Sequence, residues 1–142
     1  MEFNSFSIVG IVVATIAGFV TGALWFSPKT FFPLWWSLMG KTSADEPGAG
    51  QNMGAIFGSL VLAQVVQSLA LTVAIQGFYD NASVAQGAAT GAMLGVGIAA
   101  SSSLTHKVFS GIGKNAWWVW LIEVGNDIVG LIVMGAIIAA IA

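Results

Sequence analysis

Four long apolar stretches alternate with short polar connections along the chain. They cover about residues 5–27, 53–77, 84–106 and 116–141. Each is long enough to cross the ~30 Å hydrocarbon core of a bilayer as a helix rising ~1.5 Å per residue. The connection at 77–83 is a short turn, which makes the second and third helices antiparallel neighbours. The pattern predicts an all-α membrane protein, a single domain of four transmembrane helices in an antiparallel bundle.

A fifth apolar stretch, 28–40, is too short to span a membrane and is interrupted by Pro33. It is dense in Phe, Leu and Trp, and Lys29 and Lys41 flank it. Aromatic rings with a polar edge prefer the headgroup level, so we expect this segment to lie in the interface. Plain anchoring is favoured over a lipid or substrate portal. The expected interface anchors are Trp25, Trp35, Trp36, Trp117 and Trp118.

Small residues recur at four-residue spacing in three of the predicted helices. This spacing lets a second helix approach closely. The run in the third helix forms a groove that must be filled by a helix of this subunit or of a copy of it. A homo-oligomer or a larger membrane complex is therefore expected. The packing glycines are Gly18, Gly22, Gly54, Gly58, Gly87, Gly91 and Gly95.

The fourth helix carries Glu123 and Asp127 where hydrocarbon should be. If Trp117 marks one interface, Glu123 lies ~9 Å inside and Asp127 ~15 Å, near the midplane. Four residues turn a helix by ~400°, so both carboxyls share one face, with Asn126 beside them. Burial and like charge both oppose ionisation. We therefore expect at least one acid to be protonated or to have a polar partner on another helix.

Gln64 and Gln67 are the expected partners on the second helix. Gln64 lies ~16 Å along that helix, the same depth as Asp127, and an amide can bond a carboxyl in either protonation state. The alternative is an interhelical bond that only fixes packing. Near the end of the third helix, Ser102 and His106 could form a proton relay, although a solvated histidine is the simpler interpretation.

Composition limits the function classes. The chain has 142 residues, of which 57% are hydrophobic and 7% charged, and its mean hydropathy is +0.90. Its net charge of -2 and lack of Arg exclude a nucleic-acid-binding surface. With no Cys and one His, we expect no metal site and no cofactor. Ser101–Ser103 near His106 form no nucleophile and base pair, so we expect no enzyme.

All four lysines lie in the first and third connections. Because lysines mark cytoplasmic loops, this distribution predicts that both termini are outside the cytoplasm. The lipid bilayer itself is the surest expected partner.

Several segments together resemble a known family. They are GALWFSP at 22–28, the pair Trp35 and Trp36 followed by Gly40, WLIEVG at 120–125 and MGA at 134–136. The chain is similar over its whole four-helix plan to the bacterial membrane family called domain of unknown function 1761. The resemblance implies a multi-pass protein of the bacterial inner (plasma) membrane and implies no activity.

Two functions remain open at this point. In the first, the intramembrane acids and amides form a proton or cation site of a small oligomeric transporter or channel-like protein. In the second, the same groups bond to a partner, and the chain is a non-catalytic accessory or assembly subunit of a larger membrane complex.

Overall fold

The computed structural model describes residues 6–142, and within them every regular element is helical. Four stretches are long and apolar enough to cross a membrane: Ile8–Trp25, Met53–Phe78, Val84–Val108 and Gly113–Ile141. Ser5, where the sequence predicts the first helix to begin, lies outside the described residues. The elements in chain order are α1 (Ile8–Trp25), α2 (Phe32–Leu38), α3 (Met53–Phe78), α4 (Val84–Leu94), the π-helix η1 (Gly95–Ala100), α5 (Ser101–Val108), the 3-10 helix η2 (Gly113–Asn115) and α6 (Ala116–Ile141).

Local sequence explains where the helices begin and end. The Ser7 hydroxyl caps α1 by accepting from the Gly10 N–H at 3.1 Å. Pro28 disfavours helical geometry at the residue before it, and α1 ends at Trp25. Ser83 and Gln86 form a complete capping box at the start of α4.

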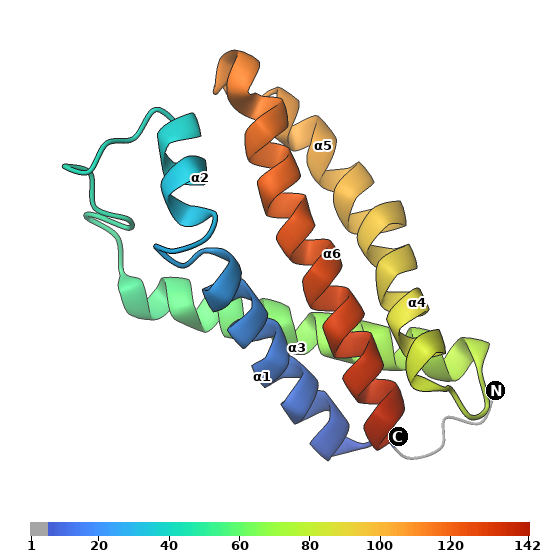
Figure 1. Cartoon of the computed structure of the whole chain (residues 1–142). Helices are drawn as coiled ribbons and strands as arrows, with labels where there is room; N and C mark the ends of the chain where they lie inside the picture. Colours follow the sequence, from blue (N-terminus) through green and yellow to red (C-terminus); the bar gives the residue numbers. More distant parts are fainter. Residues whose placement is uncertain (1–5) are drawn as a thin grey trace.

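The last helix, α6, is the centre of the molecule. It lies between α1 on one side and the α4–η1–α5 rod on the other (Figure 1). Gly10 of α1 lies beside Ile141 of α6, and Gly18 lies beside Met134. The two helices therefore run in opposite directions. The fully buried side chains Leu71 and Met134 lie in the hydrophobic core, where α3 joins this pair.

The glycine run of the third span packs on α6 of the same chain. A Cβ atom at Gly87 would collide with the Gly135 carbonyl, and one at Gly91 with the Leu131 carbonyl. One turn further, a Cβ at Gly95 would lie 3.0 Å from the Ile128 Cα. Because glycine has no side chain, the backbone of the third long helix can approach the backbone of α6 closely at these positions.

The sequence predicts one regular α-helix over 84–106. In the structure this stretch consists of α4, η1 and α5. Its middle six residues form η1, a π-helical segment in which each turn is wider. The Ala100 carbonyl, at the end of this segment, accepts a hydrogen bond from the Trp120 indole at 3.3 Å. A widened turn thereby offers a backbone acceptor to α6.

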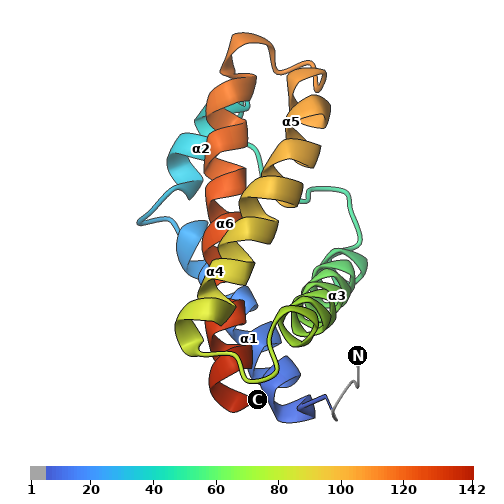
Figure 2. The same ribbon diagram turned by 90° about the vertical axis from the view of Figure 1, so that its right-hand side faces the viewer.

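Helix α3 crosses the other spans at a steep angle, as both ribbon views show (Figure 1, Figure 2). Its second half enters the core, where Leu71 and Ile75 are buried. Its first half diverges, and Phe57, Leu60 and Leu62 are exposed. A Cβ atom at Gly58 would meet nothing within 4 Å among the described residues.

Helix α2 continues beyond the end of α1 and lies beside α6 (Figure 1). The Asn115 amide, just before α6, donates to the Leu38 carbonyl at the end of α2 at 3.2 Å. The Trp25 indole, at the end of α1, donates to the Ile122 carbonyl at 2.9 Å. The first bond holds the end of α2 beside the start of α6, and the second holds the end of α1 against α6.

Candidate functional site

The Glu123 carboxylate is held by two groups from other elements. The Lys107 ammonium on α5 lies 2.7 Å from its Oε2 and 3.0 Å from its Oε1. The Trp35 indole of α2 donates to Oε1 at 3.0 Å. The Lys107 and Glu123 side chains are only 20% and 29% exposed. Glu123 thus ties α2, α5 and α6 together as one half of a shielded ion pair.

Asp127 lies one helical turn further along α6 and is half-buried. Its carboxyl interacts with the side chains of Asn126 and Glu123. Seven residues turn a helix by ~700°, so Asp127 is only ~20° from the buried Met134 around the helix axis. It therefore lies on the side of α6 that faces the core.

Two buried amide oxygens, that of Asn126 next to Asp127 and that of Gln64 on α3, lack donors among the described residues. Asn126 Oδ1 lies 3.8 Å from where a Cβ atom of Gly22 would stand, and Gln64 Oε1 fills the corresponding space at Gly18, beside the Met134 sulfur. Neither oxygen has a hydrogen-bond partner among residues 6–142. The Cβ positions of Gly18 and Gly22 are ~6 Å apart, because residues four apart are neighbours on a helix. Adding the distance from each position to its oxygen puts the two oxygens no more than about 12 Å apart.

Below Gln64, buried polar side chains follow one face of α3 at four-residue intervals. Ser68 is fully buried and Thr72 is 3% exposed. The Ser68 and Thr15 hydroxyls are 2.9 Å apart, and the Thr72 hydroxyl donates to the Ser68 carbonyl at 2.8 Å. We call this set the polar ladder; it spans ~18 Å and consists of Gln64, Ser68, Thr72 and Gln76.

The polar ladder ends in a hollow of about 580 Å³, which we call the polar pocket. It lies where the start of α1, the turn between α3 and α4 and the end of α6 meet. Gln76 and Thr72 line it from the ladder, and Gln76 Oε1 is buried without a hydrogen-bond partner in the described part of the chain. Other polar residues in its wall are Ser7, Tyr79, Asp80 and Asn81.

Sequence reasoning missed three of these four ladder residues. The depth of Gln64 along its helix marks it in the sequence, whereas Ser68, Thr72 and Gln76 look like ordinary helix residues. Their signal is the regular four-residue spacing, which places polar groups on one face of an apolar helix. Gln67 falls off this face; it is half-buried and makes no hydrogen bond in the described structure.

The other expected groups lie apart from this site. His106 and Ser102 are exposed on α5, at the end of the molecule that carries the lysines. Within residues 6–142 there is no group of three or more His, Cys, Asp or Glu that could hold a metal. Trp36 donates to the Thr42 carbonyl at 2.9 Å, while Trp117 and Trp118 are more than half exposed.

The elements GALWFSP and WLIEVG meet in space at Trp25. A Cβ atom at Gly125 would come within 2.7 Å of the Trp25 ring, so the absence of a side chain there seats the indole. The same indole donates to the Ile122 carbonyl. This contact fixes the end of α1 against α6, one turn from Asn126.

By length and composition, the four long apolar helices could each cross a membrane. A family model described as Protein of unknown function (DUF1761) matches residues 9–139, and the chain belongs to this family. The resemblance noted from the sequence is thereby confirmed. No curated protein and no solved structure matches the chain.

Proposed function

We propose that this protein is a small bacterial inner-membrane protein that handles protons or other cations at Asp127. The carrying observation is the polar ladder, which runs from the polar pocket to Gln64, whose amide oxygen lies within about 12 Å of that of Asn126, the neighbour of Asp127. Both termini outside the cytoplasm, the orientation favoured by the lysines, would place the polar pocket on the outer side.

The chemistry of the interior supports a cation. The buried oxygens of Gln64 and Asn126 and the carboxyl of Asp127 are acceptors, and no donor from residues 6–142 satisfies the two amide oxygens. A buried acceptor without a donor costs about 1–3 kcal/mol. A proton on Asp127, a hydronium ion or a small metal cation would supply the missing positive partner.

The two sides of Asp127 differ in access. Toward the polar pocket, hydroxyl and amide groups continue for the length of the ladder. Toward the lysines, Glu123 is bonded to Lys107 and Trp35, so an ion pair lies on this side of Asp127. Passage through the whole membrane would require this ion pair to open, so alternation between two states is part of the proposal.

Ion flux in liposomes tests the ladder. Purified protein should carry protons or Na⁺ above empty liposomes under a pH gradient or a membrane potential. Thr72→Val keeps the shape of the side chain but removes a ladder hydroxyl, so flux should fall at least tenfold. Ser59→Ala is the matched control, because Ser59 is an exposed hydroxyl of the same helix. Equal flux in Thr72→Val and wild type would contradict conduction along the ladder.

A second function is favoured by the divergent half of α3. Its exposed apolar face and the open Gly58 are suited to a close helix contact with another chain. The protein would then be an accessory or assembly subunit, either in a homo-oligomer or in a larger membrane complex. Absence of flux in the wild type, together with loss of a co-purifying chain in Gly58→Leu, would favour this function over transport.

A further inference from the structure

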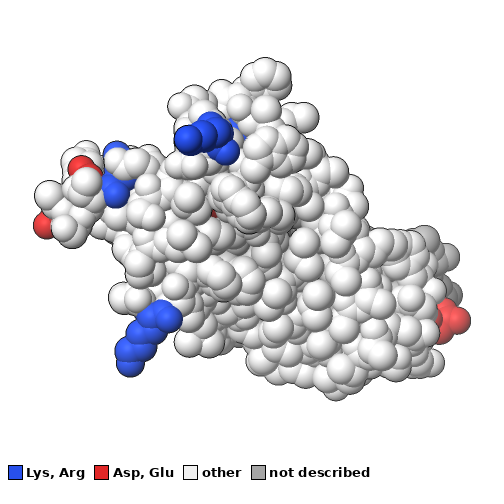
Figure 3. Space-filling view, turned by 45° about the horizontal axis from the view of Figure 1, so that its top comes forward, with Lys and Arg blue, Asp and Glu red and all other residues white. Residues whose placement is uncertain are grey.

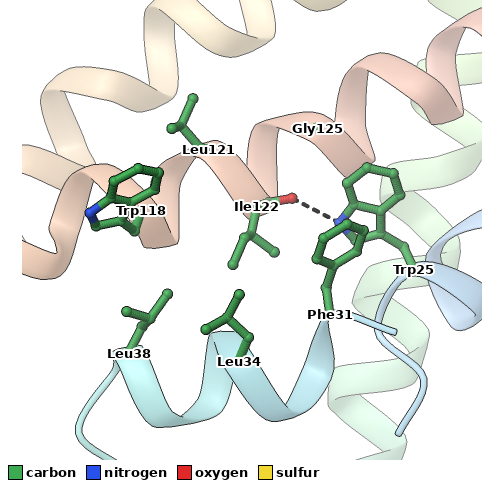
Figure 4. Close-up of a pocket in the computed structure, with 8 residues that line it drawn as sticks. All are labelled: Trp25, Phe31, Leu34, Leu38, Trp118, Leu121, Ile122 and Gly125. Carbon is green, nitrogen blue, oxygen red and sulfur yellow. Dashed lines mark hydrogen bonds between the residues drawn. The ribbon is translucent and has the colours of Figure 1, made fainter. Parts of the chain in front are cut away.

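An apolar hollow of about 500 Å³ lies between α2 and the first half of α6, apart from the polar ladder. Leu34 and Leu38 face it from α2, and Leu121 and Ile122 face it from α6 (Figure 4). Its volume is within the ~300–1,000 Å³ of small-ligand sites, and its lining consists of hydrophobic and aromatic side chains. We call it the α2–α6 hollow.

One end of the hollow is closed by rings. The Trp25 and Phe31 centroids are 4.5 Å apart, and Trp25 is fixed by its bond to the Ile122 carbonyl (Figure 4). Gly125 leaves the room that this indole occupies. A ligand cannot pass beyond this point without moving a hydrogen-bonded tryptophan.

The opposite end, between Leu38 and Trp118, carries free donors and positive charge. The Trp118 side chain is 62% exposed, and its indole N–H makes no hydrogen bond with any described residue. The bond from Asn115 to the Leu38 carbonyl places η2 at this end, and Lys114 is the residue before Asn115. Lys41 follows Leu38 by three residues.

The lysines differ in whether an acidic side chain lies close to them. Lys107 is neutralised by Glu123, and it is the one lysine in an ion pair within the described residues. Lys41 acts on Asp45: hydrogen bonds from Thr42 lower the pKa of that carboxyl most, and the Lys41 charge adds to the effect. Lys114 is exposed and has no such partner in the described chain. In Figure 3 the positive side chains lie at separate places in the upper and left parts of the view, one of them beside acidic side chains, and most of this face is uncharged.

We propose that the α2–α6 hollow binds one acyl chain of an anionic phospholipid, with its phosphate at Lys114 and the Trp118 indole N–H. The apolar walls match a hydrocarbon chain, and the free donors lie at the end where a headgroup would emerge. A tryptophan at the headgroup level commonly donates to polar lipid groups while its ring contacts hydrocarbon. Segment 28–40 would thus form a lipid site as well as an anchor.

Native mass spectrometry of the delipidated full-length protein tests this site. Phosphatidylglycerol and phosphatidylcholine with identical acyl chains are titrated separately, and the first bound lipid is counted. Wild type should retain one phosphatidylglycerol in preference to phosphatidylcholine. Lys114→Gln should weaken phosphatidylglycerol binding about fivefold, the effect of one lysine near an anionic lipid surface. Lys29→Gln, the exposed lysine at the break between α1 and α2, is the control and should bind as wild type.

Filling the hollow is the second arm. Leu34→Trp places a large ring in the hollow from a half-exposed position, and Leu121→Trp does so from α6. Each should reduce retention of the first lipid at least tenfold, whereas Leu62→Trp, on the exposed face of α3, should not. Two filling variants guard against a single one that misfolds. Equal binding of the two lipids by wild type, unchanged retention in folded filling variants, or a protein segment found in place of lipid would overturn the proposal.

Discussion

Glu123 and Asp127 are the same kind of side chain, one helical turn apart on α6, yet their surroundings differ. Glu123 receives a lysine ammonium and an indole N–H from two other elements. Asp127 lies beside Asn126, whose carbonyl oxygen has no donor among the described residues. The difference teaches that an acid in an apolar helix is not by itself a functional site. One acid has its charge matched and joins three helices, and the other has no cationic partner among the described residues.

The largest effect on this comparison should come from the contact that holds α6 in place. Gly91→Leu would drive a side chain into the Leu131 backbone, one turn beyond Asp127. Overpacking of this kind costs about 1–3 kcal/mol, and more when backbone is struck. We expect loss of the folded protein or a large drop in melting temperature in detergent. Gly58→Leu, where a Cβ atom meets nothing, should melt as wild type; equal melting of the two variants would contradict the packing described.

A double-mutant cycle would sharpen the Glu123 side of the comparison. Glu123→Leu strands the partly buried Lys107 ammonium and frees the Trp35 N–H, which should destabilise the protein by about 1–3 kcal/mol. Removing Lys107 as well, in Glu123→Leu with Lys107→Met, should recover part of this loss, because the charge is no longer stranded. Thermal melts of the four proteins measure the coupling. Strictly additive losses would mean that the ion pair does not join α5 to α6.

The smallest effect should come from an exposed acid in the 41–52 connection. The Thr42 N–H and hydroxyl donate to Asp45 Oδ2 at 2.8 and 3.1 Å, and they lower the pKa of this carboxyl. A lowered folded-state pKa means that the contribution to stability is present above the unfolded pKa of ~3.9 and is lost as pH falls through the folded value. NMR titration should show the Thr42 amide shifting with the Asp45 carboxyl below pH ~4. A midpoint above that of a free aspartate would contradict the bonds.

Much of this architecture can be predicted from the sequence, because it depends on local composition. The apolar runs mark the four long helices, and the Gly87, Gly91 and Gly95 spacing marks a close helix contact. Other features depend on where distant segments meet. Lys107 was expected in a cytoplasmic loop, but its long side chain reaches Glu123. The steep crossing angle of α3 depends on how its side chains pack against those of other helices, which the sequence of α3 alone does not specify.

The candidate site was predictable in part for the same reason. Glu123, Asp127 and Gln64 stand out because polar groups are rare in apolar runs. The sequence grouped the two acids as one site, whereas the structure gives Glu123 partners of its own. The ladder residues Ser68 and Thr72 are common in helices, and only the fold shows that they are buried between α1, α3 and α6.

The most direct measurement is proton or Na⁺ flux in liposomes with Asp127→Asn and Glu123→Gln compared side by side. Asn replaces Asp at nearly the same size but cannot bind or release a proton, so Asp127→Asn should abolish flux while the protein remains folded. Glu123→Gln can still accept from Trp35 and Lys107, so it should retain flux with a lower melting temperature. Full flux in folded Asp127→Asn, or no wild-type flux under either a pH gradient or a membrane potential, would contradict the account.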